Sequence, residues 1–302
     1  MLAGESRKPL HLSYAGATEH PEFPFDIDPA YRCAGSSFPL HTHDYTELVI
    51  VTDGHGVHIT EDETYPIIAG DVFVIAKGHA HKYEDIRHLE QLVVKYDHEV
   101  FLEHMEGLKS LPGYHALFIL EPRYREKQKF NSHLRLTGQQ VDMVVDLFLR
   151  MTREMTTQSP GYDPMVTSLF IEAVIFLSRC YSLTPSPSSK SVLEMGEVIS
   201  FIERHYQEPI TLTALAQQAH LSVNQLLRVF RSVTGQSPID YLIHLRVMKA
   251  MRLMQLRRLT ITDAAYHVGF SDSNYFSKQF KRVVGVSPRE FMRLAPRLNS
   301  DK

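Results

Sequence analysis

The chain has 302 residues, 43% of them hydrophobic, with 32 basic and 35 acidic side chains and a formal net charge of −3. These values are typical of a soluble globular protein of one to three domains and exclude a uniformly basic nucleic-acid-binding chain. The charge is divided unevenly, because residues 1–189 carry 16 basic and 26 acidic side chains, a net of −10, whereas residues 190–302 carry 16 and 9, a net of +7. The first part therefore repels phosphate and the second attracts it.

Cysteine content and the N-terminal sequence bear on the compartment. Cys33 and Cys180 are too few for a disulfide framework or a cysteine-based zinc module, and they fit a reducing cytoplasm. Residues 1–12 contain charges and a proline where a signal peptide needs an apolar core, and no apolar run approaches the roughly eighteen residues of a membrane span. We therefore expect a cytoplasmic protein without membrane insertion.

The first part of the chain is rich in short β-type runs. They cover residues 45–51, 57–61, 71–76 and 90–96 and are separated by turn signals such as Asp53-Gly54 and Lys77-Gly78. Several short strands at this spacing predict an antiparallel barrel or sandwich.

Beyond residue 137 the apolar residues recur at helical spacing. Thr137 can cap one helix, and Pro164 can open a second, so that the two form a helical hairpin over residues 137–182. Its apolar face either packs on the barrel or forms a dimer seam, and amphipathicity alone leaves both alternatives open.

A polar, proline-rich segment at residues 183–191 coincides with the change of charge sign and is interpreted as a linker. It separates a β-rich domain (1–136) and its hairpin from a C-terminal domain, 192–302, in which all predicted elements are helices. The fold class is thus α+β multidomain. The C-terminal helices are expected at residues 192–206, 212–219, 223–234, 238–256, 262–268, 273–284 and 288–294.

The C-terminal domain contains a repeat about 50 residues long. Residues 211–234 and 260–284 each contain a short helix, a tight turn and a second helix, and each is followed by a Gly-x-Ser-Pro sequence. Ser222 and Gln225 form a capping-box pattern, Asp272 can cap the matching helix, and Gly269 suits a positive φ in the turn. The pattern predicts two helix-turn-helix motifs.

Each second helix has an apolar ridge that must face the core, formed by Leu226 and Phe230 in one motif and Phe276 and Phe280 in the other. The side chains predicted to face outward and read base edges are Asn224, Gln225, Arg228, Ser273, Asn274, Ser277 and Lys278. Arg231, Lys281 and Arg282 are placed to contact phosphates. The alternative is that these are solvated faces of a protein-binding helical bundle.

These motifs resemble a known family. The run from residue 210 to 294, with Ala-His-Leu-Ser ending at Ser222 and Ala-Ala-Tyr-His-Val-Gly-Phe-Ser-Asp ending at Asp272, resembles the DNA-binding domain of AraC/XylS transcription regulators. The resemblance implies operator binding, usually as a dimer, and activation through RNA polymerase. It also places Asp263 and Asp272 where related activators touch the sigma subunit, although both residues equally suit a role as helix-start carboxylates.

The N-terminal domain resembles the cupins. Residues 35–54 fit the first cupin motif with His41, His43 and Glu47, and the second motif is met in part, with His81 present but Ala76 and Asp85 departing from the pattern. The resemblance implies a β-barrel with a central cavity that these four side chains would face. Three imidazoles and one carboxylate suit a divalent transition metal.

In regulators of this family, however, such barrels generally bind a small effector, often a sugar, and polar side chains would bind its hydroxyls equally well. The sequences of residues 41–51 and 65–75 are similar to those of the sensors of L-rhamnose operon regulators. His41, His43, Glu47 and His81 are therefore expected to hold an effector or a metal ion. His55, His58 and His79 match no motif and are expected at the rim or surface.

We expect a cytoplasmic, sequence-specific transcription regulator, an activator of sugar genes and not an enzyme. Two alternatives stay open. One is a metal-dependent cupin enzyme with a helical appendage, for which the His41, His43, Glu47 and His81 set argues. The other is a ligand-independent repressor whose barrel is only a dimerisation platform.

Overall fold

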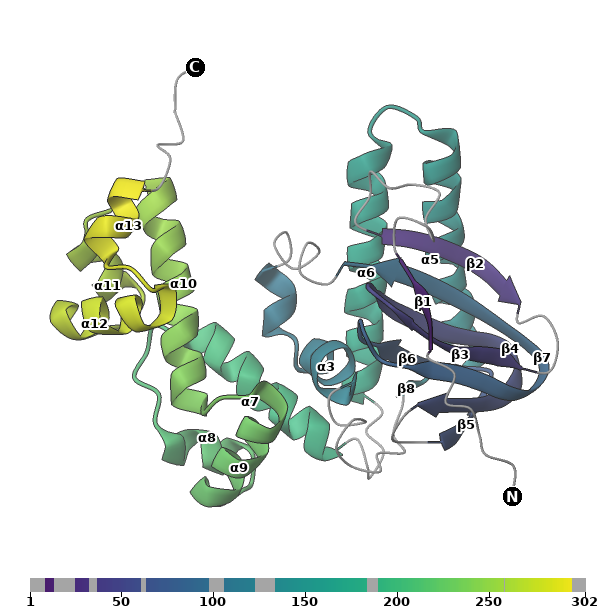
Figure 1. Ribbon diagram of the computed structural model, residues 1–302, viewed down its shortest axis with the longest axis horizontal. Coiled ribbons are helices and arrows are strands. Elements are labelled where there is room, and N and C mark those ends of the chain that lie inside the picture. The colour runs from purple at the N-terminus through teal and green to yellow at the C-terminus, as the bar shows by residue number, and fades with distance from the viewer. Residues whose placement is uncertain are drawn as a thin grey trace. The chain divides into compact units, whose positions relative to one another are not determined.

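The computed structural model divides the chain into two compact units, Met1–Gly196 and Glu197–Lys302, each with its own hydrophobic core. The first holds the strands and the helical hairpin, and every described element of the second is a helix (Figure 1). The structure describes residues 9–13, 25–32, 37–60, 64–97, 106–122, 134–183, 190–257 and 259–294. Cys33 and the body of the predicted linker, residues 184–189, lie outside the described residues.

The strands of the first unit pair into one eight-stranded sheet, in the order β1-β3-β7-β4-β6-β8, with β2 added on β7 and β5 on β4. The pairing is antiparallel except between β1 and β3. This confirms the predicted cupin-like β-domain. The strands are β1 (Leu10–Leu12), β2 (Phe25–Arg32), β3 (Phe38–His43), β4 (Thr46–Thr60), β5 (Thr64–Ile68), β6 (Asp71–Ile75), β7 (His81–Tyr96) and β8 (Leu134–Arg135).

One predicted turn is wrong. The sequence Asp53-Gly54 does not end a strand, because β4 continues through it and pairs with β7 on both sides, with register shifts on either side of Asp53. Gly54 has φ +75°, and a Cβ there would lie 2.2 Å from the carbonyl oxygen of His88. The glycine therefore allows a β-bulge where the two long strands approach closely. The sequence Asp53-Gly54 alone does not distinguish this bulge from a turn.

The hairpin follows β8. α5 (Gly138–Thr157) begins with the capping box of Thr137 and Gln140, and α6 (Tyr162–Leu183) begins two residues before Pro164, the predicted start. Phe170 of α6 contacts Phe25 of β2, with ring centroids 5.0 Å apart, so part of the hairpin packs on the sheet. Before the hairpin lie three short elements, η1 (Glu106–Ser110), α3 (Pro112–Tyr114) and η2 (His115–Leu120), which the sequence pattern did not predict.

By length and composition, α6 is apolar enough to cross a membrane, since an 18-residue window has a mean hydropathy of 1.5. This corrects the expectation that no segment approaches a membrane span. Half of that window is nevertheless buried, and Phe170, Ala173 and Leu177 are fully enclosed. A core helix of a soluble protein passes the same test, so α6 is weak evidence for a membrane span.

The predicted helices of the C-terminal domain are all found, with ends shifted by at most two residues. Both recognition helices, α9 and α12, match their predicted ranges. The bounds are α7 (Lys190–His205), α8 (Leu212–Gln218), α9 (Val223–Thr234), α10 (Pro238–Arg257), α11 (Ile261–His267), α12 (Ser273–Val284) and α13 (Pro288–Leu294).

Helix α10 joins the two helix-turn-helix motifs. Near its start, the ring of Tyr241 lies 5.8 Å from that of Phe230 in α9. Further along, Val247 and Ala250 belong to the same core cluster as Phe276 of α12. Because different residues of α10 pack against the two motifs, the helix acts as a strut between them.

Candidate functional site

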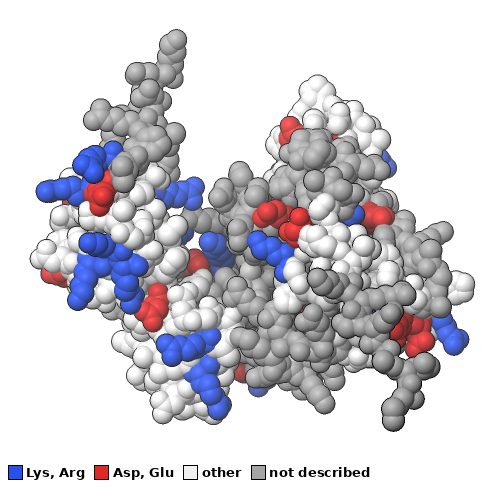
Figure 2. Space-filling model, in the orientation of Figure 1, with Lys and Arg blue, Asp and Glu red and all other residues white. Residues whose placement is uncertain are grey.

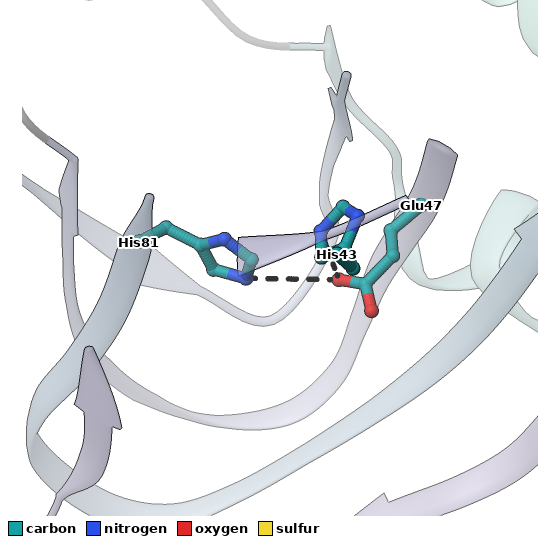
Figure 3. Close-up of side chains that lie close together, drawn as sticks. All are labelled: His43, Glu47 and His81. Carbon is teal, nitrogen blue, oxygen red and sulfur yellow. Dashed lines mark ion pairs between the residues drawn. The ribbon is translucent and has the colours of Figure 1, made fainter. Parts of the chain in front are cut away.

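Three of the four predicted barrel residues meet inside the first unit. His43 ends β3, Glu47 lies at the start of β4 and His81 begins β7, and all three are buried. The Nε2 atoms of His43 and His81 each lie 3.7 Å from the Glu47 carboxylate, so both rings face one oxygen (Figure 3). The ligand atoms of the three side chains all lie within 4.8 Å of one another. We call this set the His-Glu-His cluster.

Backbone carbonyls orient both imidazole rings of the cluster. The Nδ1–H of His43 donates to the carbonyl of Tyr45 at 2.6 Å, and that of His81 donates to the carbonyl of His79 at 3.3 Å. A carbonyl only accepts, so the proton of each neutral ring is on Nδ1. Each Nε2 then offers a lone pair to the interior, and among the described residues neither Nε2 has a hydrogen-bond partner.

Burial shifts the pKa of each group in the cluster in the direction that favours the neutral form of the group. It lowers the pKa of His43 to about 4 and that of His81 well below its usual value, where neighbouring histidines lower it further. Burial raises the pKa of Glu47 to about 7, partly opposed by the charge of Lys95. Removing a charged group from water disfavours its charged form, and here desolvation dominates all three shifts.

Two other histidines lie beside the cluster, His41 at the cavity as predicted and His58 in the interior. His41 is buried, and its ring centroid lies 4.1 Å from that of His81, but it is not among the atoms that converge on Glu47. His58 is 1% exposed and forms a hydrogen bond with the hydroxyl of Tyr65. Its ring centroid lies 5.4 Å from that of His81. Its prediction as a rim histidine is wrong, because it points inward from β4 in a strand that continues past Gly54.

A cavity of about 110 Å³ adjoins the cluster. Gln91 and Lys95 of β7 lie among its walls with Val93, at alternate positions on one face of the strand. Alternation along the strand predicted for residues 90–96 is the sequence signal that places these side chains on one face. The cavity is lined by Leu12, Phe38, His41, Tyr45, Glu47, His81, Tyr83, Gln91, Val93 and Lys95.

The second unit presents two matching helix surfaces. In α9, Asn224, Gln225, Arg228 and Arg231 are exposed, while Leu226 and Phe230 are buried. In Figure 2, Lys and Arg side chains gather over α12 and again near α9. In α12 the exposed predicted residues are Asn274, Lys278, Lys281 and Arg282, and Ser273 and Ser277 are half-buried.

Hydrogen bonds within the motifs refine the predicted reading surface. The side-chain amide oxygen of Gln225 accepts hydrogen bonds from the backbone N–H and the hydroxyl of Ser222, which confirms the capping box. The same oxygen is the acceptor that Gln225 would use to recognise adenine, and these bonds occupy it. Arg282 donates to Asp240 of α10 at 3.1 Å, so part of its charge is paired. Asn224, Arg228, Asn274 and Lys278 keep exposed side chains near the start of each recognition helix.

The two acidic residues of the second motif lie at helix starts: Asp272 is the N-cap of α12, and Asp263 lies in the first turn of α11, after the N-cap Thr260. Asp272 accepts from the backbone N–H of Tyr275 at the start of α12, and Asp263 accepts from the hydroxyl of Thr260 at the start of α11. Both side chains are also exposed. Tyr275, beside Asn274, is 48% exposed and was not among the predicted residues.

Comparison with known proteins gives the family. A model of the AraC-like ligand binding domain matches residues 24–174, half of the chain, and a helix-turn-helix domain model matches residues 215–294. The chain is 30% identical to the HTH-type transcriptional activator RhaS of Escherichia coli O157:H7 over 259 residues, which are 86% of this chain and 89% of that protein. RhaS of Escherichia coli O1:K1 / APEC gives the same identity and coverage.

Two solved structures are also similar to the chain. The DNA-binding domain of AdpA, in complex with a target DNA, is 30% identical over 33% of this chain and 90% of that chain, with a TM-score of 0.31. Apo ToxT from Vibrio cholerae is 16% identical over 91% of this chain and 98% of that chain, with a TM-score of 0.34. On the two domain models and the similarity to RhaS over most of its length, the chain belongs to the AraC family of DNA-binding transcriptional activators, not to a family of enzymes.

Proposed function

We propose that the barrel binds a small sugar and that the bound sugar changes how the C-terminal unit engages its operator. The polar lining of the 110 Å³ cavity carries the sugar assignment: Gln91, Lys95 and His41 can bond hydroxyls, and Tyr45 and Tyr83 can cover the apolar face of a sugar ring. The similarity of residues 41–51 to the sensors of L-rhamnose operon regulators makes L-rhamnose the first candidate.

The sugar must prefer one arrangement of the protein, because a ligand with equal affinity for two arrangements shifts neither population. The barrel and the DNA-reading helices belong to different units. The regulated quantity is therefore the fraction of molecules whose two helix-turn-helix motifs are free to bind DNA.

Operator reading is assigned to the duplicated recognition helices. Asn224 and Arg228 in α9 and Asn274 and Lys278 in α12 have the side chains that pair with adenine and guanine edges, and all four are exposed. Arg231 and Lys281, further along the helices, are assigned to phosphates, with Arg282 and Gln225 contributing less because of their internal bonds. Ser273 and Ser277 complete the α12 surface.

Replacing Arg228 or Asn274 with alanine is expected to weaken specific operator binding by about 1–3 kcal/mol, roughly 5- to 150-fold in Kd. Fluorescence anisotropy on a duplex located by footprinting upstream of the gene measures the change, with unrelated DNA as the second substrate. Arg87→Ala, at an exposed position on β7 of the first unit, is the control and should leave both affinities unchanged. A loss that is equal on both DNAs would mark phosphate contacts and contradict the assignment to bases.

Further partners follow from exposed surfaces. Met143 and Leu149 of α5 and Met165 of α6 are each about half exposed, and we assign this hairpin face to a homodimer contact. Asp263 and Asp272 keep exposed carboxylates in addition to their capping bonds, which is compatible with a contact to the RNA polymerase sigma subunit. A cytoplasmic location follows from these partners.

A further inference from the structure

The first unit contains a second cavity, of about 190 Å³, between η2 and the ends of β6 and β7. It is larger than the 110 Å³ cavity assigned to the sugar, and among the described residues the two linings share only Tyr45. η2 is a π-helix, a rare element that is frequently found at functional sites. The proposed sugar site does not account for this cavity.

Aromatic and aliphatic side chains form most of the cavity wall. Tyr96 and Phe118 belong to it, and both are buried. Phe118 stacks on Tyr114, with ring centroids 5.4 Å apart, and Tyr96 packs edge-on against Phe170 at 5.7 Å. Each of these two walls is thus fixed by a second ring, so the cavity is formed before a ligand binds. Preformed, mostly apolar cavities with a few polar groups are the usual sites for small molecules.

The volume of the cavity sets the size of its ligand. An apolar cavity of about 150 Å³ holds one benzene molecule. A cavity of about 190 Å³ therefore holds one six-membered aromatic ring with a short chain attached. The rings of Tyr96 and Phe118 are suitable partners for such a ring, in stacked or edge-on geometry.

Three charged side chains lie at the mouth of the cavity. Asp44, Lys77 and Asp97 belong to the lining, and all three are exposed. Lys77 can balance only one of the two carboxylates, so one basic and two acidic groups leave the mouth with a net charge of −1. The net charge of −10 over residues 1–189 attracts cations as well. This charge favours a ligand whose chain ends in an ammonium group.

We propose that the second cavity binds a small aromatic amine, with its ring against Tyr96 and Phe118 and its ammonium group at Asp44 and Asp97. Because Tyr45 lines both cavities, the bound amine contacts a side chain of the sugar site. The first unit thus has sites for two chemically different ligands. The amine site does not rest on the sugar assignment.

Phenethylamine tests the site, and 3-phenylpropionate, which has the same ring and chain length but the opposite charge, is the matched control ligand. Isothermal titration calorimetry of the full chain at low salt is expected to show saturable binding of about one phenethylamine per chain. Its affinity should exceed that of 3-phenylpropionate at least about fivefold, because the mouth attracts one charge and repels the other.

Variants of the mouth test the role of its charge. Asp44→Asn and Asp97→Asn should each weaken phenethylamine binding about 2- to 5-fold, the usual effect of one exposed ion pair. Asp53→Asn is the control, since Asp53 is an exposed β4 residue that does not line the cavity. It makes the same change in total charge and should bind phenethylamine as the parent does.

Ala76→Phe tests the location. Ala76 is a half-buried lining residue, and a phenyl group there should fill the cavity and abolish phenethylamine binding. Circular dichroism checks that the variant is folded, and the aspartate variants serve where it is not. No saturable binding to the parent, or binding that the folded Ala76→Phe variant leaves unchanged, would overturn the site. Equal affinity for phenethylamine and 3-phenylpropionate would overturn the assignment of a cationic ligand.

Discussion

Phe276→Ala is expected to lower the free energy of unfolding of the C-terminal unit by about 3–5 kcal/mol, the usual loss when a fully buried phenylalanine is truncated. The side chain is 0% exposed, and its ring lies 5.1 Å from that of Phe270 and 5.6 Å from that of Phe280. These contacts hold α12 against the turn before it. Urea titration followed by the helical circular dichroism signal measures the loss.

Tyr275→Ala is the matched control, because Tyr275 precedes Phe276 on the same helix and is 48% exposed. We expect it to cost less than about 1 kcal/mol. A cost below about 1 kcal/mol for Phe276→Ala as well would show that the second motif does not depend on this core. Operator affinity measured on the same samples should fall for Phe276→Ala, since α12 must stay docked to present Asn274.

Gly269→Ala is expected to be nearly as damaging, for two separable reasons. Gly269 has φ +90°, a region that costs an L-residue about 1–2 kcal/mol. A Cβ would also lie 2.5 Å from the carbonyl oxygen of Gln207, a backbone atom that cannot move independently. The turn must therefore shift, and we expect a total cost of at least about 3 kcal/mol.

Gly285→Ala measures the cost of the positive φ alone. Gly285 has φ +87°, but apart from its chain neighbours no described residue has an atom within 4 Å of its would-be Cβ, so only the dihedral cost of about 1–2 kcal/mol is expected. Thermal unfolding of the two variants side by side gives the difference. If both lose the same stability, the close approach of Gln207 does not constrain the turn.

The first motif shows why this glycine could be predicted only in part. His220 follows α8 as Gly269 follows α11, and it adopts φ +52° in the same kind of turn. The positive φ follows from the local turn pattern, and the sequence of the repeat was enough to predict it. The contact with Gln207 comes from a distant residue, and nothing near Gly269 in the sequence indicates it.

In the rest of the molecule, too, features set by local sequence could be predicted, and features set by distant contacts could not. Helices α9 and α12 could be predicted to the residue because their caps at Ser222 and Asp272 and their apolar spacing are local signals. The full lengths of β4 and β7 could not be predicted in this way, because Asp53-Gly54 has the sequence of a turn. Only the close approach of the His88 backbone to Gly54 shows that the strand continues. The predicted place of His58 was wrong for another reason: the residue lies in a predicted strand, 57–61, but matches no motif, so nothing in the sequence indicated that it is buried.

In the barrel, the resemblance to the cupins implied that His43, Glu47 and His81 lie together, and the structure brings these residues together from three different strands. The resemblance also included His41, whose side chain lies beside His81 and not opposite Glu47. Gln91 and Lys95 were missed because they match no motif, although they alternate on β7. In the recognition helix α9, helix capping and adenine recognition by Gln225 would both use its side-chain amide oxygen. The residue type alone does not show which of the two uses applies.

Operator binding with and without sugar tests the central claim most directly. Fluorescence anisotropy of the full chain on its footprinted operator, at fixed metal content, is compared with L-rhamnose, with other monosaccharides and with no sugar. We predict that one sugar changes the operator Kd at least about tenfold, equivalent to about 1.4 kcal/mol of coupling, and that unrelated DNA is unaffected. An operator Kd that no sugar changes, in a protein whose barrel binds no sugar, would contradict it.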